Sequence, residues 1–128
     1  MLGLLKIVMK KYIAEFIGTF AMIFCGTGAM TINEVTGGDV THVGIGITWG
    51  LIVMAMIYAF GEISGAHFNP AVSIAFAYAK KFSWKEVPKY IFFRVAGAFA
   101  ASLLLMWLFP KSEFLGSTIP TVDVWRAF

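Results

Sequence analysis

The sequence predicts an all-α membrane protein that has three transmembrane helices and one re-entrant half-helix. Composition is the first reason: 59% of the 128 residues are hydrophobic and only 13% are charged, whereas globular proteins are roughly 45–50% apolar and about 25% charged. Continuity is the second, because the apolar residues form three stretches that each approach the ~20 residues needed to span hydrocarbon. A soluble core is a poor alternative, since so short a chain could not bury three such stretches.

The first two predicted helices are separated by a short turn. The first helix covers residues 12–31 and contains one charged residue, Glu15. The run Thr-Gly-Gly-Asp that follows is a cluster of loop-forming residue types and marks the turn. The second helix covers residues 43–60, which carry no charge, and Gly61 and Gly65 are expected to end it.

A shorter apolar segment comes next, and its first residues are Asn69-Pro70-Ala71. Asn is among the best helix N-caps, and Pro is tolerated in the first turn because the amide there has no intrahelical partner. The sequence therefore predicts a half-helix over residues 69–79, preceded by an extended stretch over residues 64–68. A helix that starts inside a membrane is tolerated only where it lines a cavity, because unpaired backbone groups in lipid are costly. This helix start therefore indicates a pore or a binding site.

The third transmembrane helix is predicted over residues 89–109. Pro88 falls in its first turn, where proline is tolerated. An external tail over residues 110–128 completes a single membrane domain that extends over residues 1–128.

The placement of lysines predicts the orientation in the membrane. Three lysines precede the first helix and four lie between the half-helix and the third helix, whereas the loop over residues 33–42 carries no Lys or Arg. Cytoplasmic loops carry the excess of Lys and Arg, so we expect a multi-pass protein of the inner membrane with a cytoplasmic N-terminus. The net charge of +3 reflects this topology. The expected partner is the lipid bilayer, and no nucleic acid is expected.

Four stretches of the chain together resemble the aquaporin and glycerol-facilitator family, the major intrinsic proteins. They are AEFIGTF in the first helix, WGL in the second, SGAHFNPAV around the half-helix and GAFAAS in the third. Asn-Pro-Ala alone is common by chance, but the combination is highly specific. The resemblance covers nearly the whole chain and only the first half of the family's pattern, in which a second, inverted copy follows. It implies that the chain is the first repeat of the aquaporin-like inverted-repeat fold.

The resemblance also implies roles for the residues around the half-helix. Asn69 would donate from its side-chain amide to a water or hydroxyl oxygen, beside the positive end of the half-helix dipole. The carbonyls before it would form a ladder of acceptors along the pore wall. His67 is expected to fix the loop, and a role in sensing pH is the alternative. The pore-lining residues implied here are Gly65, Ala66, His67, Phe68, Asn69, Pro70 and Ala71.

Glu15 is a carboxylate inside a predicted span, and such groups are costly unless they have a function. The resemblance implies that it accepts hydrogen bonds from the re-entrant loop and holds Asn69 in place. Two alternatives are direct binding of a proton or cation, and a simple ion pair with Arg94. Arg94 itself departs from the Gln that is usual in the family. It is expected either to extend to the cytoplasmic face or to pair with Glu15 or Glu62.

Trp49 aligns, by resemblance, with the aromatic wall of the family's external constriction. A tryptophan there resembles the glycerol facilitators and the plant nodulin-type channels, and an indole suits the carbon edge of a polyol or a metalloid acid. A tryptophan of the interfacial belt is the alternative. The arginine of the family's filter belongs to the second repeat.

These residues lead to one functional prediction and two alternatives. The prediction is half of an aquaporin or aquaglyceroporin-like channel for water or small uncharged solutes such as glycerol, with no enzymatic activity, cofactor or metal. Its pore would need a second half, so we expect a fragment of a longer protein or, failing that, an inverted homo-oligomer. The alternatives are a proton-coupled small multidrug transporter that uses Glu15, and a non-conducting membrane subunit.

Overall fold

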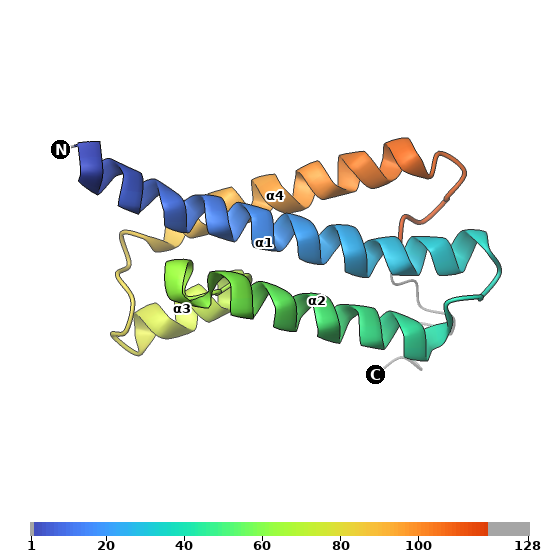
Figure 1. Cartoon of the computed structure of the whole chain (residues 1–128), viewed down its shortest axis with the longest axis horizontal. Coiled ribbons are helices and arrows are strands. Elements are labelled where there is room, and N and C mark those ends of the chain that lie inside the picture. Colours follow the sequence, from blue (N-terminus) through green and yellow to red (C-terminus); the bar gives the residue numbers. More distant parts are fainter. Residues whose placement is uncertain (1, 118–128) are drawn as a thin grey trace, which may run out of the picture.

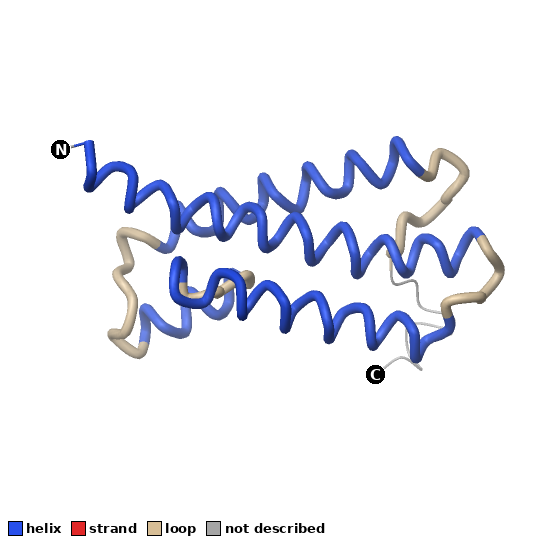
Figure 2. Tube along the Cα trace, viewed as in Figure 1, coloured by secondary structure: helices blue, strands red, loops and turns tan. Residues whose placement is uncertain are grey.

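A computed structural model describes residues 2–117, with their side chains from residue 9 onward. This part of the chain contains four α-helices and no strand. In Figure 1, α1 (Leu2–Val35) lies between α2 (Thr41–Ser64) and α4 (Val87–Leu108), and it contacts both. The short α3 (Pro70–Tyr78) lies at the end of the bundle where α2 ends and α4 begins, and Figure 2 shows the loops that join them. The predicted all-α fold with one half-helix is confirmed.

All three long helices have the length and hydropathy needed to cross a membrane. α1 starts at Leu2 rather than at residue 12, because the residues of the lead-in are mostly good helix formers. α2 continues through Gly61 to Ser64, so the prediction that Gly61 ends this helix was wrong. A single glycine weakens a helix by about 1 kcal/mol without ending it. Gly65 does end α2, with a left-handed φ of 84° and its N–H bonded to the carbonyl of Gly61.

The opposite end of the bundle is held by Glu34, near the end of α1. Its carboxylate accepts the hydroxyl of Ser112 at 2.7 Å and the backbone N–H of Glu113 at 2.9 Å. These bonds fasten the segment after α4 to α1. The predicted external tail is described as far as Ser117, so its remainder lies outside the described residues.

Small residues let α1 approach its neighbours closely. A Cβ added at Gly97 of α4 would lie 2.4 Å from the carbonyl oxygen of Phe16, so the two backbones touch. A Cβ at Gly18 would lie 2.1 Å from the ring of Phe68, which therefore rests on α1. α2 is less buried than α1 and α4, because Ser64 is the one residue of α2 that is buried. An apolar helix that is so little covered meets lipid or other helices in a bilayer.

Candidate functional site

Residues 65–68 join α2 to α3 in an irregular segment, the re-entrant turn. Three of its residues have positive φ angles, 84° at Gly65, 46° at Ala66 and 43° at Phe68. The predicted extended conformation was therefore wrong. Left-handed backbone costs roughly 1–2 kcal/mol per non-glycine residue, and such strain persists only where the surroundings enforce it.

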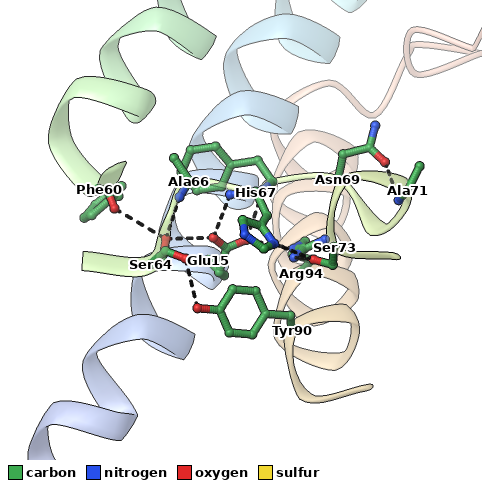
Figure 3. Close-up of polar contacts among 11 residues, drawn as sticks. Glu15, Phe60, Ser64, Ala66, His67, Asn69, Ala71, Ser73, Tyr90 and Arg94 are labelled. Carbon is green, nitrogen blue, oxygen red and sulfur yellow. Dashed lines mark hydrogen bonds and ion pairs between the residues drawn. The ribbon is translucent and has the colours of Figure 1, made fainter. Parts of the chain in front are cut away.

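The group that enforces this turn is the carboxylate of Glu15, a fully buried residue of α1. Its Oε1 accepts the backbone N–H of His67 at 3.0 Å, and its Oε2 accepts that of Phe68 at 3.0 Å. The hydroxyl of Ser64 donates to Glu15 Oε1 at 2.7 Å and accepts the N–H of Ala66 at 3.1 Å. Figure 3 shows how these bonds converge. Three successive N–H groups are thus held by one polar cluster, which an extended strand could not achieve.

The carbonyls of the same turn are left without donors. Within the described residues, no N–H or O–H group donates to the backbone oxygens of residues 65–68. When successive N–H groups converge on an anion, the carbonyls are turned away from it. The turn therefore presents unpaired acceptors on the side opposite to Glu15.

Asn69 is the N-cap of α3. Its Oδ1 accepts the N–H of Ala71 at 2.8 Å (Figure 3), and its backbone is extended with φ −144°. This bond occupies the side-chain oxygen, so the amide nitrogen with its two N–H donors is the remaining polar group. Asn69, Pro70 and Ala71 are all exposed. The first turn of α3 thus combines an exposed amide with the positive end of a helix.

Arg94 pairs with Glu15, which was one of the expected alternatives, and it does not extend to the membrane surface. Its Nε donates to Glu15 Oε2 at 2.7 Å, and the residue is 2% exposed. Its Nη2 donates to the hydroxyl of Ser73 at 2.5 Å. Its guanidinium carbon lies 5.4 Å from the ring centre of Tyr90, within the range of a cation–π contact. A buried ion pair needs such additional bonds, and Glu15 accepts four in total.

His67 is enclosed by aromatic rings. The ring centres of Phe76, Phe82 and Tyr90 lie 5.0, 4.7 and 5.3 Å from that of the imidazole. Nδ1 of His67 lies 2.8 Å from the hydroxyl oxygen of Ser73. These contacts hold the imidazole between α3, α4 and the loop that joins them.

A groove with a volume of about 490 Å³ runs along this turn. Five of the predicted pore residues, 65–69, contribute to its lining, and Glu15 lies behind them. The groove is lined by Met22, Val53, Ile57, Gly61, Gly65, Ala66, His67, Phe68, Asn69, Val72 and Phe76.

Trp49 is absent from the lining of this groove. Its indole packs on α1, where a Cβ added at Gly26 would lie 2.2 Å from the ring. Trp49 nevertheless precedes Val53 of the groove by one helical turn. Its role in a constriction stays a prediction.

Three polar residues of the site were missed by sequence reasoning: Ser64, Ser73 and Tyr90, whose hydroxyl donates to the carbonyl of Ser64 at 2.9 Å. Ser73 carried a usable signal, because it follows Asn69 by one helical turn and so shares its face of α3. Nothing in the sequence indicates that its hydroxyl meets Arg94.

A second carboxylate, Glu86, joins α1 to α4 outside the membrane spans. It accepts the hydroxyl of Tyr12 at 2.7 Å and the Nζ of Lys89 at 3.1 Å, and it forms an ion pair with Lys11. Hydrogen bonding to Lys11 is the largest of the effects that lower the pKa of Glu86 to about 2. Within the described part of the chain, no cluster of three or more His, Cys, Asp or Glu side chains could hold a metal ion.

The fold and this site define a multi-pass helical membrane protein whose half-helix begins at a groove that carries the exposed amide of Asn69. The sequence model of the family described as Major intrinsic protein matches residues 5–128. The chain belongs to this family, as its sequence motifs predicted.

Two plant relatives and one solved structure illustrate the similarity. The chain is 51% identical over 115 residues to the probable aquaporin NIP4-2 of Arabidopsis thaliana, covering 88% of this chain and 40% of the relative. It is 55% identical over 117 residues to aquaporin NIP1-3 of Oryza sativa subsp. japonica, covering 90% and 41%. The X-ray structure of the aquaglyceroporin from Plasmodium falciparum matches with a TM-score of 0.74 and 32% identity, over 84% of this chain and 47% of that one. The chain thus spans about 40% of the length of the plant relatives.

Proposed function

We propose that the chain forms one half of an aquaporin-like channel that conducts water or small uncharged solutes such as glycerol. The observation that carries the proposal is the groove wall, where the exposed amide of Asn69 follows a turn whose carbonyls have no donors within the described residues. Membership in the major intrinsic protein family supports it, together with relatives named as aquaporins and a structural neighbour named as an aquaglyceroporin. Conduction of this kind is passive and involves neither an enzymatic step nor a cofactor.

A polar solute would exchange its hydration for the groups of this wall. Its oxygen accepts from the Asn69 amide, while its hydrogens donate to the carbonyls of residues 65–68. The positive end of the α3 dipole disfavours cations at this point. A fixed donor also orients water so that a chain of proton transfers is interrupted. Glu15 supports the wall from behind by holding the N–H groups of the turn.

A conduction path needs a second wall opposite the first turn of α3, which is exposed in this chain. Inverted-repeat membrane proteins supply that wall with a copy of the same unit, related by a pseudo-two-fold axis in the membrane plane. We assign the opposite wall to such a second half, either in a longer polypeptide or in a second copy of this chain within a homo-oligomer.

The membrane topology is part of the proposal. The cytoplasmic side would carry the N-terminus and the exposed Lys80, Lys81 and Lys85, because positive charge is retained inside. The host membrane would be the cell's inner membrane. Trp49 would then lie nearer the external mouth than Asn69 and would contribute an apolar wall to the filter.

A proton-coupled transporter that uses Glu15 is less well supported. Such a carboxylate must exchange its proton with the aqueous path, whereas Glu15 is fully buried. Its two oxygens already accept four hydrogen bonds, one of them from Arg94. The carboxylate is therefore committed to the turn and to the ion pair.

Stopped-flow light scattering on proteoliposomes tests the proposal. The chain is reconstituted alone, and together with the C-terminal part of the rice relative NIP1-3, and vesicle shrinkage is followed after an osmotic step and in a glycerol gradient. We expect fast shrinkage with both halves present and its loss in Asn69→Asp, since a carboxylate at this position removes the donor. Asn33→Asp is the matched control, because it makes the same change near the C-terminal end of α1, where Oδ1 of Asn33 accepts the N–H of Thr41 at 2.8 Å.

Each outcome of this experiment is decisive. Flux from the chain alone means that two copies complete the pore, and flux only with both halves means that the opposite wall is a separate sequence. Permeability equal to that of empty liposomes in both preparations, with the protein inserted, overturns the proposal and favours a non-conducting subunit.

A further inference from the structure

A line of hydrogen bonds runs from Arg94 through Ser73 to His67 (Figure 3). Nη2 of Arg94 lies 2.5 Å from the hydroxyl oxygen of Ser73, which lies 2.8 Å from Nδ1 of His67. The exposed fractions of Arg94, Ser73 and His67 are 2%, 0% and 8%. Because water has so little access, these groups must share the available hydrogens among themselves.

The direction of each bond follows from the donors present. A guanidinium has N–H donors and no acceptor, so the oxygen of Ser73 accepts from Arg94. Within the described residues, the Ser73 hydroxyl forms one other hydrogen bond, to Nδ1 of His67. A buried hydroxyl without an acceptor costs roughly 1–3 kcal/mol. The arrangement that gives the Ser73 hydroxyl both an incoming and an outgoing hydrogen bond has it donating to a bare Nδ1, which leaves the ring proton on Nε2.

We propose that Arg94 is a positioning residue that acts through Ser73 to fix His67 as the neutral Nε2–H tautomer. The inference rests on the proposed function only in treating the groove as a pore. A Cβ at Gly65 would lie 3.2 Å from Nε2, and both Gly65 and His67 line the groove. The groove wall therefore carries an N–H donor at this point and does not change its charge with pH.

The charged and titratable groups around His67 come from two helices, with Glu15 on α1 and Tyr90 and Arg94 on α4. A second proton on His67 would occupy Nδ1 and reverse the bond to Ser73, whose own hydrogen would then lose its acceptor. It would also place a cation two hydrogen bonds from the Arg94 guanidinium. Glu15 would favour that cation, but its charge is already paired with Arg94 at 2.7 Å.

Nitrogen-15 NMR of the full chain with labelled histidine shows directly which ring nitrogen of His67 carries the proton. The chain has two histidines, His67 and His42, and the exposed His42 at the start of α2 provides the reference signal. We expect His67 to show a bare Nδ1 and a protonated Nε2 from about pH 5 to about pH 8, the range in which histidines commonly change charge.

Three substitutions separate the effect of the Arg94 charge from that of the Ser73 hydrogen bond. Arg94→Gln should move the midpoint of the His67 titration to higher pH, because Glu15 then acts on the imidazole without its counter-ion. Arg94→Lys keeps the charge and should restore most of the wild-type response. Ser73→Ala keeps the charge but removes the hydroxyl, so the Nδ1 resonance should shift to that of a nitrogen without a hydrogen bond. Ser102→Ala, at an exposed serine of α4, is the matched control.

A proton on Nδ1 of wild-type His67 at neutral pH overturns the proposal. An Arg94→Gln variant whose His67 titrates as in the wild type also overturns it. Should that variant not fold, Ser73→Ala decides, and an unchanged Nδ1 resonance counts against the proposal. The readout requires no flux, so an Nε2–H tautomer in a non-conducting protein supports this inference while rejecting the proposed function. A conducting protein with Nδ1 protonated supports the proposed function while rejecting this inference.

Discussion

Glu15 and Glu86 both connect α1 to α4, and they do so in different surroundings. Glu15 is fully buried beside the re-entrant turn and pairs with Arg94. The side chain of Glu86 is 20% exposed at the end of the bundle, and it pairs with Lys11 and Lys89. Both carboxylates hold cations of the same chain, so the ion pair alone does not distinguish them.

The difference lies in the other donors. Glu15 accepts two backbone N–H groups, from His67 and Phe68, whereas Glu86 accepts side-chain donors, including the hydroxyl of Tyr12. Backbone donors let Glu15 dictate the φ angles of the turn that leads to Asn69. Side-chain donors let Glu86 fasten two helices without shaping either backbone. A buried carboxylate of this kind therefore belongs to the site, and the exposed one belongs to the scaffold.

The largest expected effect is that of Glu15→Ala. This change leaves Arg94 buried without a counter-ion and two N–H groups without acceptors, and breaking a buried ion pair costs about 3–5 kcal/mol. Chemical unfolding in detergent micelles, followed by circular dichroism, measures the loss. The double variant Glu15→Ala, Arg94→Met should recover part of it, because the unpaired cation is removed as well. A loss no greater than that of Glu86→Ala would break the comparison between the two carboxylates.

An intermediate effect is expected for Gly18→Ala, which disturbs the same turn through the side chain of Phe68. The new Cβ would lie 2.1 Å from the ring of Phe68, whose backbone N–H is held by Glu15. Overpacking of this kind costs about 1–3 kcal/mol, and the same unfolding measurement detects it.

Gly46→Ala is the matched control for that change. Nothing lies within 4 Å of a Cβ added at Gly46, and replacing a helical glycine by alanine stabilises by up to about 1 kcal/mol. Equal losses of stability in Gly18→Ala and Gly46→Ala would mean that the ring of Phe68 does not pack on α1 at Gly18.

The contrast between these regions also explains what the sequence could predict. Three apolar stretches and the Asn69-Pro70 cap predict the helices, because spanning length and cap chemistry are local properties. The support of the turn by Glu15 came from the family resemblance. The left-handed angles at Ala66 and Phe68 were missed, because they depend on a carboxylate some fifty residues away in the sequence.

The partner of Arg94 is a second feature that could not be predicted from the sequence. The long side chain of Arg94 allowed three destinations, the membrane surface, Glu15 or Glu62. The choice depends on distances across α1, α3 and α4, which no single segment contains. Ser73 became part of the site for the same reason, since it meets Arg94 only after α3 and α4 have packed, and Phe82 meets His67 through the loop that joins these helices.

The smallest expected effect is that of Glu86→Gln, and its pH dependence separates the two carboxylates. The pKa of Glu86 is lowered from 4.5 to about 2 in the folded chain. Its stabilising contribution is therefore complete above about pH 4.5 and is lost as the pH falls through about 2. At neutral pH we expect Glu86→Gln to cost about 1 kcal/mol or less, because partly exposed ion pairs contribute little.

The difference in the free energy of unfolding between Glu86→Gln and wild type should vanish near pH 2. It should also shrink in about 1 M salt, where the screening length is ~3 Å. Asp39→Asn, at an exposed carboxylate between α1 and α2, makes the same change in net charge and is the control. A loss that persists at low pH and in high salt would show that Glu86 acts through packing, and the distinction between a site carboxylate and a scaffold carboxylate would then fail.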